Sequence, residues 1–515
     1  MIIPQVIRRT KAENRLAQCR VRPGIAQAQQ IYVARTQALL AKAGEGGLPL
    51  SSVHTSPAAA PALESRTLFG HPKGLAYLAF TEAWERFSYY GMSALLVLYM
   101  VNQLLLPGHV ENVAGFAAFR SMIEGTFGPM STQALASQIF GLYSGFVYFT
   151  PVLGGWLGDR MGQRNAVVIG ALSMSGGHLA MAFDHSFLLA LLLLIIGSGL
   201  LKGNISAQVG SVYPPEDEER RSRGFAIFST GINFGAVAGP LLCGFLGERY
   251  GWHVGFGAAA LFMLGALATY LSGYRYLPAR VERKARVNSA PLTADDRKAV
   301  LALLIVMAIT VLPQIAYYQL ANVLPVWLQD HANMSAGTFD VPIPWYQSID
   351  PLFSIIGLPL LFALWSWQGQ GAGEPSEVRK IAIGSFICGG ANLVLVAAIL
   401  FSPGRVLWTW PFLYCAVQGI GFMYFWPPLL SLVSRAAPAK VNATMMGSSF
   451  LVLFVANNLI GWIGTFYERM SPTEFWGMHA AIGAAGGVFA LLFGRTMGRI
   501  LEPQPGAASS VRSKS

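Results

Sequence analysis

Hydrophobic residues form long runs along most of this chain, and polar residues collect between the runs. A helix that crosses a bilayer needs about 20 apolar residues. Each run is expected to be a helix, because a single segment in hydrocarbon must satisfy its own backbone hydrogen bonds. The pattern therefore predicts twelve transmembrane helices, at residues 75–105, 137–158, 165–184, 186–213, 222–247, 252–275, 299–328, 343–368, 379–401, 406–433, 441–467 and 474–498.

The loops between these runs differ in their content of basic residues. Loops that follow even-numbered runs are rich in Lys and Arg, as at residues 220–223 and 280–286, whereas the opposite loops carry few. Basic loops of membrane proteins face the cytoplasm. We therefore expect the even-numbered loops and both termini on the cytoplasmic side.

The longest basic loop divides the runs into two groups of six. We expect an N-terminal six-helix bundle at 67–275, a cytoplasmic linker at 276–298 and a C-terminal six-helix bundle at 299–500. Residues 1–66 are predicted to form a disordered basic tail, and residues 501–515 a disordered C-terminal tail. The first segment can equally be an extension from a misassigned start, and a transit peptide is the alternative.

The composition also indicates a membrane protein. Of the 515 residues, 36 are Lys or Arg and 25 are Asp or Glu, so charged residues make up 12% and hydrophobic residues 53%. A soluble domain carries about twice that charged fraction, which argues against a cytosolic enzyme and against intrinsic disorder. The mean hydropathy is +0.47. The net charge of +11 is not gathered in a polar domain, as nucleic-acid binding would require.

Catalytic and metal-binding patterns are absent from the sequence. The four cysteines are scattered without a C-x-x-C pair, so they predict neither a disulfide framework nor a metal site. No H-E-x-x-H, G-x-S-x-G or P-loop pattern supports a membrane-embedded enzyme. We therefore expect neither an enzyme nor a cofactor or metal site, and an inactive binding receptor remains an alternative to a transporter.

Ionisable residues inside a membrane helix are costly, so they mark functional sites. The first run contains Glu82, Glu85 and Arg86, whose spacings of three and four residues place them on one helix face. Tyr89 and Tyr90 extend this face by another turn. One arginine neutralises one glutamate, and the remaining acid can take a proton or a cation. The triplet indicates proton coupling, and the alternative is a structural ion pair between helices.

Two further ionisable residues lie in or near predicted helices. Lys202 follows a long apolar run in the fourth predicted helix. Its ammonium group either reaches the membrane interface or points inward, where it would hold an anion or pair with a carboxylate. Asp350 stands directly before Pro351, near the start of the eighth predicted helix. That pair is typical of a helix N-cap and first turn, so a cap and a ligand group both remain open for Asp350.

The segment from Glu82 to Gly91 resembles the E-x-x-E-R-F-x-Y-Y-G signature of the proton-dependent oligopeptide transporter family, within the major facilitator superfamily. Further similar segments are Gly154–Gly162, Gly199–Ser206, Gly231–Gly235, Gly251–Phe256, Trp345–Phe353 and Ala443–Gly447. The resemblance covers residues 68–500. It implies an all-α membrane protein with the major facilitator superfamily fold, in which twelve transmembrane helices form two six-helix bundles around a substrate site.

The resemblance also implies proton-coupled symport of di- and tripeptides or peptide-like substrates by alternating access. The residues implied in proton coupling are Glu82, Glu85, Arg86 and Lys202. The residues implied in substrate binding are Arg86, Tyr89, Tyr90, Tyr148, Lys202, Asn233, Gln319 and Asp350. The expected partners are protons, small peptides and membrane lipid but no nucleic acid, and the expected setting is a monomer in the bacterial inner membrane.

Four positions depart from the family pattern. Ser449 stands where the eleventh helix of the family has a tryptophan. Tyr318 stands where the seventh helix of the family has a glutamate, and Phe422 stands where its tenth helix has one. Conversely, Asp350 replaces an asparagine of the eighth helix. Either Asp350 is a relocated anionic site for the amino group of the substrate, or the amine site is lost. In the second case the substrate is another organic or inorganic anion without an amino group.

Overall fold

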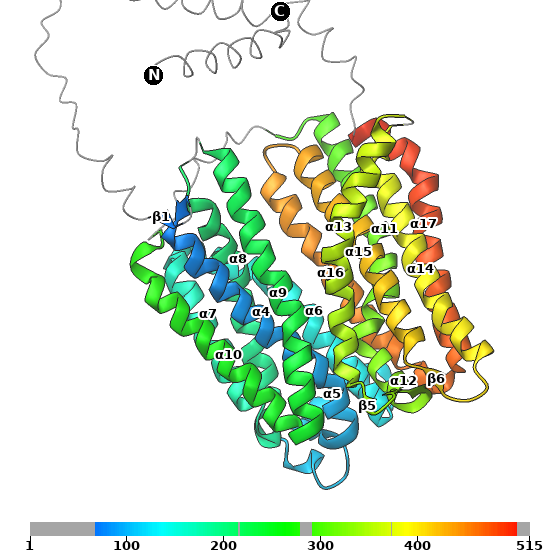
Figure 1. Cartoon of the computed structure of the whole chain (residues 1–515). Coiled ribbons are helices and arrows are strands. Elements are labelled where there is room, and N and C mark those ends of the chain that lie inside the picture. Colours follow the sequence, from blue (N-terminus) through cyan, green and yellow to red (C-terminus); the bar gives the residue numbers. More distant parts are fainter. Residues whose placement is uncertain (1–66, 69, 215–216, 279–290, 372, 502–515) are drawn as a thin grey trace, which may run out of the picture. The chain divides into compact units, whose positions relative to one another are not determined.

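The computed structural model describes residues 67–68, 70–214, 217–278, 291–371 and 373–501, and this part is built from the α-helices α4 to α17 (Figure 1). Both predicted tails and most of the predicted linker lie outside the described residues, apart from the few positions next to the helices. The helices α4 to α10 pack mainly on one another, and so do α11 to α17.

Six long helices from the first half of the chain match the first six predicted spans. They are α4 (Lys73–Tyr99), α6 (Thr132–Met161), α7 (Gln163–Ala180), α8 (Phe187–Ser211), α9 (Glu218–Tyr250) and α10 (Trp252–Gly273). A π-helical turn, Met100–Leu104, continues α4. The hydrophobic runs did not predict α5 (Phe116–Phe127), which lies between α4 and α6 and has 12 residues, too few to cross a bilayer.

Six long helices from the second half match the remaining spans. They are α11 (Ala294–Asn322), α13 (Tyr346–Gly369), α14 (Glu377–Phe401), α15 (Thr409–Ala436), α16 (Asn442–Gly464) and α17 (Pro472–Leu501). The seventh predicted span divides at Val323, and the short helix α12 (Leu324–His331) follows α11 with Pro325 in its first turn. Proline suits that position because the first amide groups of a helix have no partner within the helix.

The remaining elements are short and close the connections between helices. Two-residue strands pair as β1 (Thr67–Leu68) with β2 (His71–Pro72), β3 (Ala332–Asn333) with β6 (Val406–Leu407), and β4 (Ser335–Ala336) with β5 (Phe339–Asp340). Single 3₁₀ turns occur at Val110–Asn112, Asp184–Ser186, Tyr274–Tyr276, Ile343–Trp345 and Tyr467–Arg469. None of these strands forms a layer of the core, so the predicted all-α class is confirmed.

Nine of the twelve long helices in the described residues are long and apolar enough to cross a membrane. The other three are α4, α6 and α7. Helix α4 contains Glu82, Glu85 and Arg86, whose charges reduce its hydropathy, yet it packs along α9 and α10 within the N-terminal bundle. A charged helix enclosed by more apolar ones is the expected position for a functional membrane helix.

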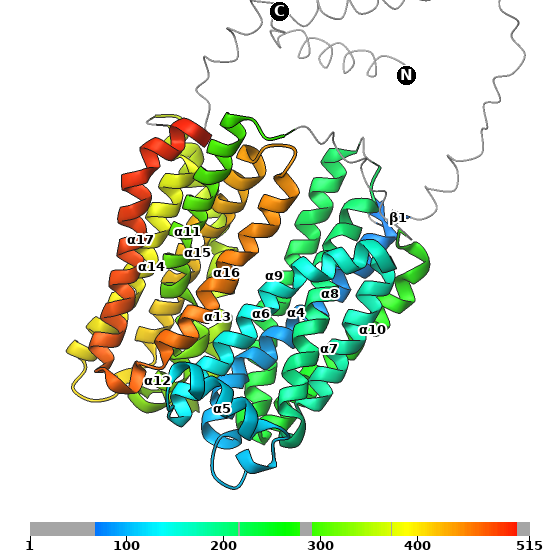
Figure 2. The ribbon, with the colours of Figure 1, turned by 180° about the vertical axis from the view of Figure 1, so that it is seen from behind.

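The two bundles are joined near α5 and α12, and their ribbons diverge toward the opposite end (Figure 1, Figure 2). Asn102 and Gln329 exchange two side-chain hydrogen bonds of 2.9 and 3.0 Å. Ser348 of α13 donates to the carbonyl of Val237 on α9 at 2.7 Å. We call the end of the molecule that contains α5, α12 and the Asn102–Gln329 contact the α5/α12 end.

Helices α6 and α16 contact each other at a pair of glycines. A Cβ atom placed on Gly141 would lie 2.5 Å from the Cα atom of Gly461, a separation that real Cβ atoms do not reach. Small residues allow such close helix contact in membranes. This contact fixes one helix of the N-terminal bundle against one of the C-terminal bundle.

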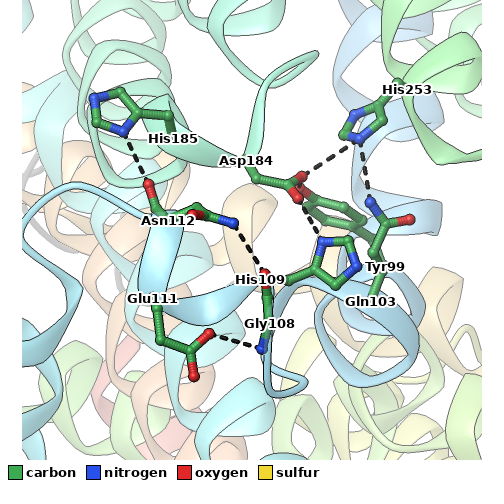
Figure 3. A network of polar contacts seen from close by, with 9 residues as sticks. All are labelled: Tyr99, Gln103, Gly108, His109, Glu111, Asn112, Asp184, His185 and His253. Carbon is green, nitrogen blue, oxygen red and sulfur yellow. Dashed lines mark hydrogen bonds and ion pairs between the residues drawn. The ribbon is translucent and has the colours of Figure 1, made fainter.

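A polar network ties the connections of the N-terminal bundle together at the α5/α12 end (Figure 3). The carboxylate of Asp184 accepts a hydrogen bond from the Tyr99 hydroxyl and lies 2.9 Å from Nδ1 of His109. Nε2 of His253 lies 3.4 Å from the same carboxylate and 3.2 Å from Nε2 of Gln103. The network thus links the end of α4, the turn before α8 and the start of α10.

Candidate functional site

The charged residues of α4 form a compact buried group. Nε of Arg86 lies 2.8 Å from Oε1 of Glu82 and 2.7 Å from Oε2 of Glu85. The exposed fractions are 3% for Glu82, 0% for Glu85 and 8% for Arg86. Helix α9 closes over the group, because Gly235 has no side chain and a Cβ there would lie 2.6 Å from Cβ of Arg86. The common face expected from the sequence spacing is present.

The two glutamates do not share the arginine equally. The Nε hydrogen of Arg86 points to Glu82, which accepts a hydrogen bond, so the contact with Glu85 is one of charge alone. Neither carboxylate oxygen of Glu85 has a hydrogen-bond donor in the described part of the chain. A buried carboxylate without donors is strongly destabilised as an anion. Of the two glutamates, Glu85 is therefore the one that is stabilised more by binding a proton.

Lys202 on α8 points into the protein and not to a membrane interface. Its Nζ atom is buried, and among the described residues it has no hydrogen-bond or ion-pair partner. It lies 4.4 Å from the ring centre of Tyr89 and 5.3 Å from that of Tyr148. Aromatic faces attract cations at such distances. The interface alternative for Lys202 is therefore wrong, and an ammonium group is available for an anion.

Five tyrosines connect Lys202 to the C-terminal bundle, and we call them the tyrosine belt: Tyr89, Tyr90, Tyr148, Tyr317 and Tyr318. Tyr89 and Tyr90 meet edge to face with ring centres 5.2 Å apart. The hydroxyl groups of Tyr148 on α6 and Tyr318 on α11 lie 3.3 Å apart and so join the two bundles. Tyr317 and Tyr318 meet edge to face at 5.0 Å. The expected set omitted Tyr317 and Tyr318. The only signal in the sequence was at Tyr318, which stands where the family has a glutamate.

Asp350 lies at the other end of the tyrosine belt. Helix α13 begins at Tyr346 with Trp345 as its N-cap, so Asp350 stands inside the helix and the N-cap alternative is wrong. Its Oδ2 atom accepts a hydrogen bond from the Tyr317 hydroxyl. Its Oδ1 atom is buried without a donor, and the residue is 8% exposed.

Two of the expected substrate-binding residues lie apart from this arrangement. Gln319 is 0% exposed and donates to the carbonyl of Ile460 at 3.2 Å, while Asn322 donates to its Oε1 atom at 3.2 Å. This amide therefore joins α11 to α16. Asn233 is exposed on α9 and makes no hydrogen bond with the described residues. Within the described part of the chain, neither side chain forms a hydrogen bond with the tyrosine belt, although Gln319 directly follows Tyr318 on α11.

A metal centre has no basis in the described residues, where no three side chains of His, Cys, Asp or Glu gather closely enough to hold an ion. The site instead has two cationic side chains and two glutamates in the N-terminal bundle and one aspartate in the C-terminal bundle. Such an arrangement fits a small molecule with a carboxylate at one end.

Known proteins resemble this chain along most of its length. Residues 78–461 match the family described as Major Facilitator Superfamily. The uncharacterized transporter YclF of Bacillus subtilis (strain 168) is 31% identical over 82% of this chain and 94% of its own length. A di-/tripeptide transporter of Lactococcus lactis subsp. cremoris is 27% identical over 83% of this chain and 96% of its own.

Solved structures resemble the chain as well. The crystal structure of the peptide transporter POT in complex with sulfate has 27% sequence identity and a TM-score of 0.73, and covers 85% of this chain and 97% of that one. A mutant of a peptide transporter POT in complex with alafosfalin has 28% identity and a TM-score of 0.74, with the same coverage.

Proposed function

Because the chain belongs to the major facilitator superfamily, and within it to the proton-dependent oligopeptide transporter family, we propose that it imports di- and tripeptides or peptide-like substrates together with protons. It is a transporter and not an enzyme. The observation that carries the proposal is a buried group in which Glu82 and Glu85 share Arg86, beside Lys202, a buried cation without an ion-pair partner in the described chain.

Competition for the arginine couples the proton to the substrate. When a proton binds Glu85, this acid no longer needs Arg86, and the guanidinium together with Lys202 can hold a substrate carboxylate. When the proton leaves, Glu85 attracts both cations again and the substrate carboxylate loses its partners. Proton and substrate therefore bind together and leave together.

Alternating access supplies the transport step. The basic loops support an extracellular position for the α5/α12 end. In that orientation, contacts such as Tyr148–Tyr318 and Asn102–Gln329 close the protein toward the outside. In the outward-facing form these contacts break and the opposite ends of the bundles meet. The protein works in this way as a monomer in the bacterial inner membrane.

A second candidate keeps the same fold and transports an organic or inorganic anion without an amino group. It is favoured by Tyr318 and Phe422, which stand where the family has glutamates. Arg86 and Lys202 would then hold the anion, and the tyrosine belt would line the rest of the site.

Uptake into proteoliposomes tests the proposed function. Purified protein is reconstituted and given labelled dialanine under an inward proton gradient, with Lys202→Ala as the inactive control. We expect accumulation that requires the gradient, competes with other dipeptides and is lost in the control. Equal uptake with and without the gradient would exclude proton coupling. A complete lack of dipeptide uptake would favour the second candidate.

A further inference from the structure

Tyr143 on α6 carries a buried hydroxyl group that has no hydrogen-bond partner in the described part of the chain. The residue is 2% exposed. A buried hydroxyl without a partner costs free energy, and most such groups in folded proteins are paired. A bond that forms in another state of the transport cycle would satisfy this hydroxyl.

The ionisable side chain that acts most strongly on Tyr143 is Glu85 on α4. Glu85 is 0% exposed, and neither of its carboxylate oxygens has a hydrogen-bond donor among the described residues. An unpaired hydroxyl on α6 thus faces an unpaired carboxylate on α4. The two groups can satisfy each other, because a phenol both donates and accepts hydrogen bonds.

The geometry of α6 explains why Tyr143 points into the N-terminal bundle. Gly141 and Gly145 lie on the side of α6 that contacts α16 in the C-terminal bundle. Residues two apart on a helix differ in direction by about 200°. Tyr143 stands between these glycines, so its side chain leaves the opposite side of the helix, toward Glu85.

Tyr148 lies on the side of α6 that faces the C-terminal bundle. It follows Gly141 by about two helical turns, so it shares the direction of that glycine. Its hydroxyl lies 3.3 Å from that of Tyr318 on α11. Helix α6 therefore carries a neighbour of Glu85 on one side and a contact between the bundles on the other.

The charged and titratable groups that face Glu85 or Tyr143 come from α4, α6 and α8. They are Glu82, Arg86 and Tyr89 on α4, Tyr148 on α6 and Lys202 on α8. Helices α9 and α10 also pack on α4, but their described residues bring no titratable group to Glu85. The two cations of this set favour an ionised Glu85, whereas an uncharged phenol can pair with the protonated acid as well.

The charge of Glu85 decides which partner it takes. In this structure Oε2 of Glu85 lies 2.7 Å from Nε of Arg86, and the carboxylate makes no bond to Tyr143. This arrangement suits an anion, which a guanidinium group stabilises more than a neutral hydroxyl does. A protonated Glu85 has no charge to hold it at Arg86, and its buried O–H group needs an acceptor.

We propose that Tyr143 accepts a hydrogen bond from protonated Glu85 when Arg86 turns to the carboxylate of the substrate. The inference rests on the proposed proton-coupled transport and adds a residue that stabilises the proton-bound state. Tyr143 is a positioning residue, because it holds the protonated acid away from Arg86 and does not touch the substrate. The bond also connects the proton-bound acid to α6, the helix whose Tyr148 contacts the C-terminal bundle.

The pH dependence of dialanine uptake tests this role. Wild type, Tyr143→Phe and Tyr270→Phe are reconstituted in proteoliposomes of fixed internal pH, and the initial uptake rate is measured as the external pH is lowered. Tyr143→Phe removes the acceptor and keeps the ring. Tyr270 is the matched control, because it is 0% exposed in the same bundle but its hydroxyl shares hydrogen bonds of 2.9 and 3.0 Å with Gln208.

We expect wild type and Tyr270→Phe to have the same pH midpoint, and the midpoint of Tyr143→Phe to lie about 0.5–1 pH unit lower, the scale of one neutral hydrogen bond. The sign follows because a bond that favours protonated Glu85 is lost, so more acid is needed to load it. At saturating acidity Tyr143→Phe should reach the wild-type rate.

A second pair of variants separates this role from a structural one. In Glu85→Gln no proton binds at this position, so adding Tyr143→Phe should leave the exchange of internal for external dialanine unchanged. A loss of exchange in the double variant, or an unmoved or more alkaline midpoint in Tyr143→Phe, would overturn the role of Tyr143, while peptide transport itself stands. If the wild type takes up no dialanine at any pH, the proposed function fails and this inference with it.

Discussion

Replacing Glu85 with glutamine should separate substrate movement from the proton gradient. Glu82 accepts the hydrogen bond of Arg86, whereas Glu85 has no donor. We therefore expect the group of Glu82, Glu85 and Arg86 to exchange one proton, at Glu85. One proton per substrate and a gradient of one pH unit supply about 1.4 kcal/mol, which corresponds to accumulation of about tenfold. Glu85→Gln keeps the shape of the side chain but cannot change its charge, so the accumulation ratio should fall to about one, the value without coupling.

The assay follows labelled dialanine in proteoliposomes with the membrane potential clamped to zero. Exchange of internal for external dialanine, which needs no net proton movement, should persist in Glu85→Gln. Glu111→Gln, which alters an exposed carboxylate near the α5/α12 end, is the matched control and should accumulate substrate as the wild type does. Our assignment of the proton to Glu85 would be refuted if Glu85→Gln still accumulated dialanine as the wild type does and Glu82→Gln did not.

Three further predictions concern contacts outside this group. Tyr318→Phe removes a hydroxyl contact between the bundles and should weaken the inward-facing form by about 0.5–1 kcal/mol, seen as faster labelling of a cysteine introduced at the α5/α12 end; unchanged labelling would contradict this. His253→Gln removes a partner of the Asp184 carboxylate and should lower the free energy of unfolding by at most about 1 kcal/mol, measured by thermal melting; an unchanged melting temperature would speak against the ion pair. The backbone N–H of Met130 lowers the pKa of Glu124, so this carboxylate stabilises the end of α5 above its unfolded pKa and loses that effect as the pH falls through the lowered value. The protection of the Met130 amide against hydrogen exchange, relative to its intrinsic rate, should therefore fall only at acidic pH, below the ordinary pKa of a glutamate. Loss of this protection at neutral pH would exclude this role for Glu124.

The helices and the charged group of α4 could be predicted because both depend on short-range patterns. Runs of apolar residues place the helices, since hydrocarbon requires internal backbone hydrogen bonds. The three- and four-residue spacings of Glu82, Glu85 and Arg86 fix one helix face whatever packs against it. The break at Val323 was missed because Pro325 is compatible with both a kink and a new helix start.

The surroundings of Lys202 and Asp350 could not be predicted, because they depend on contacts between helices far apart in the sequence. The direction of the Lys202 side chain is set by Tyr89 and Tyr148, which come from two other helices. Asp350 next to proline looked equally suited to a cap, but the turn Ile343–Trp345 starts the helical path earlier and leaves Asp350 inside α13. The predicted span from residue 343 already contained Asp350, but the Asp-Pro pair by itself did not exclude a cap.

The charges of the assembled site lead to a last prediction, on the number of protons carried. Glu82, Glu85 and Asp350 contribute three negative charges when ionised, and Arg86 and Lys202 contribute two positive ones, so the site with a bound zwitterion is neutral after one proton is added. A substrate whose amine is blocked brings an additional negative charge, and a second proton is then needed for neutrality, because a net charge in the membrane interior is costly. The proton-to-substrate ratio, measured from reversal potentials in proteoliposomes, should therefore be higher by one for N-acetyl-dialanine than for dialanine. An equal ratio for both compounds would mean that the loaded site does not have to be neutral to cross the membrane.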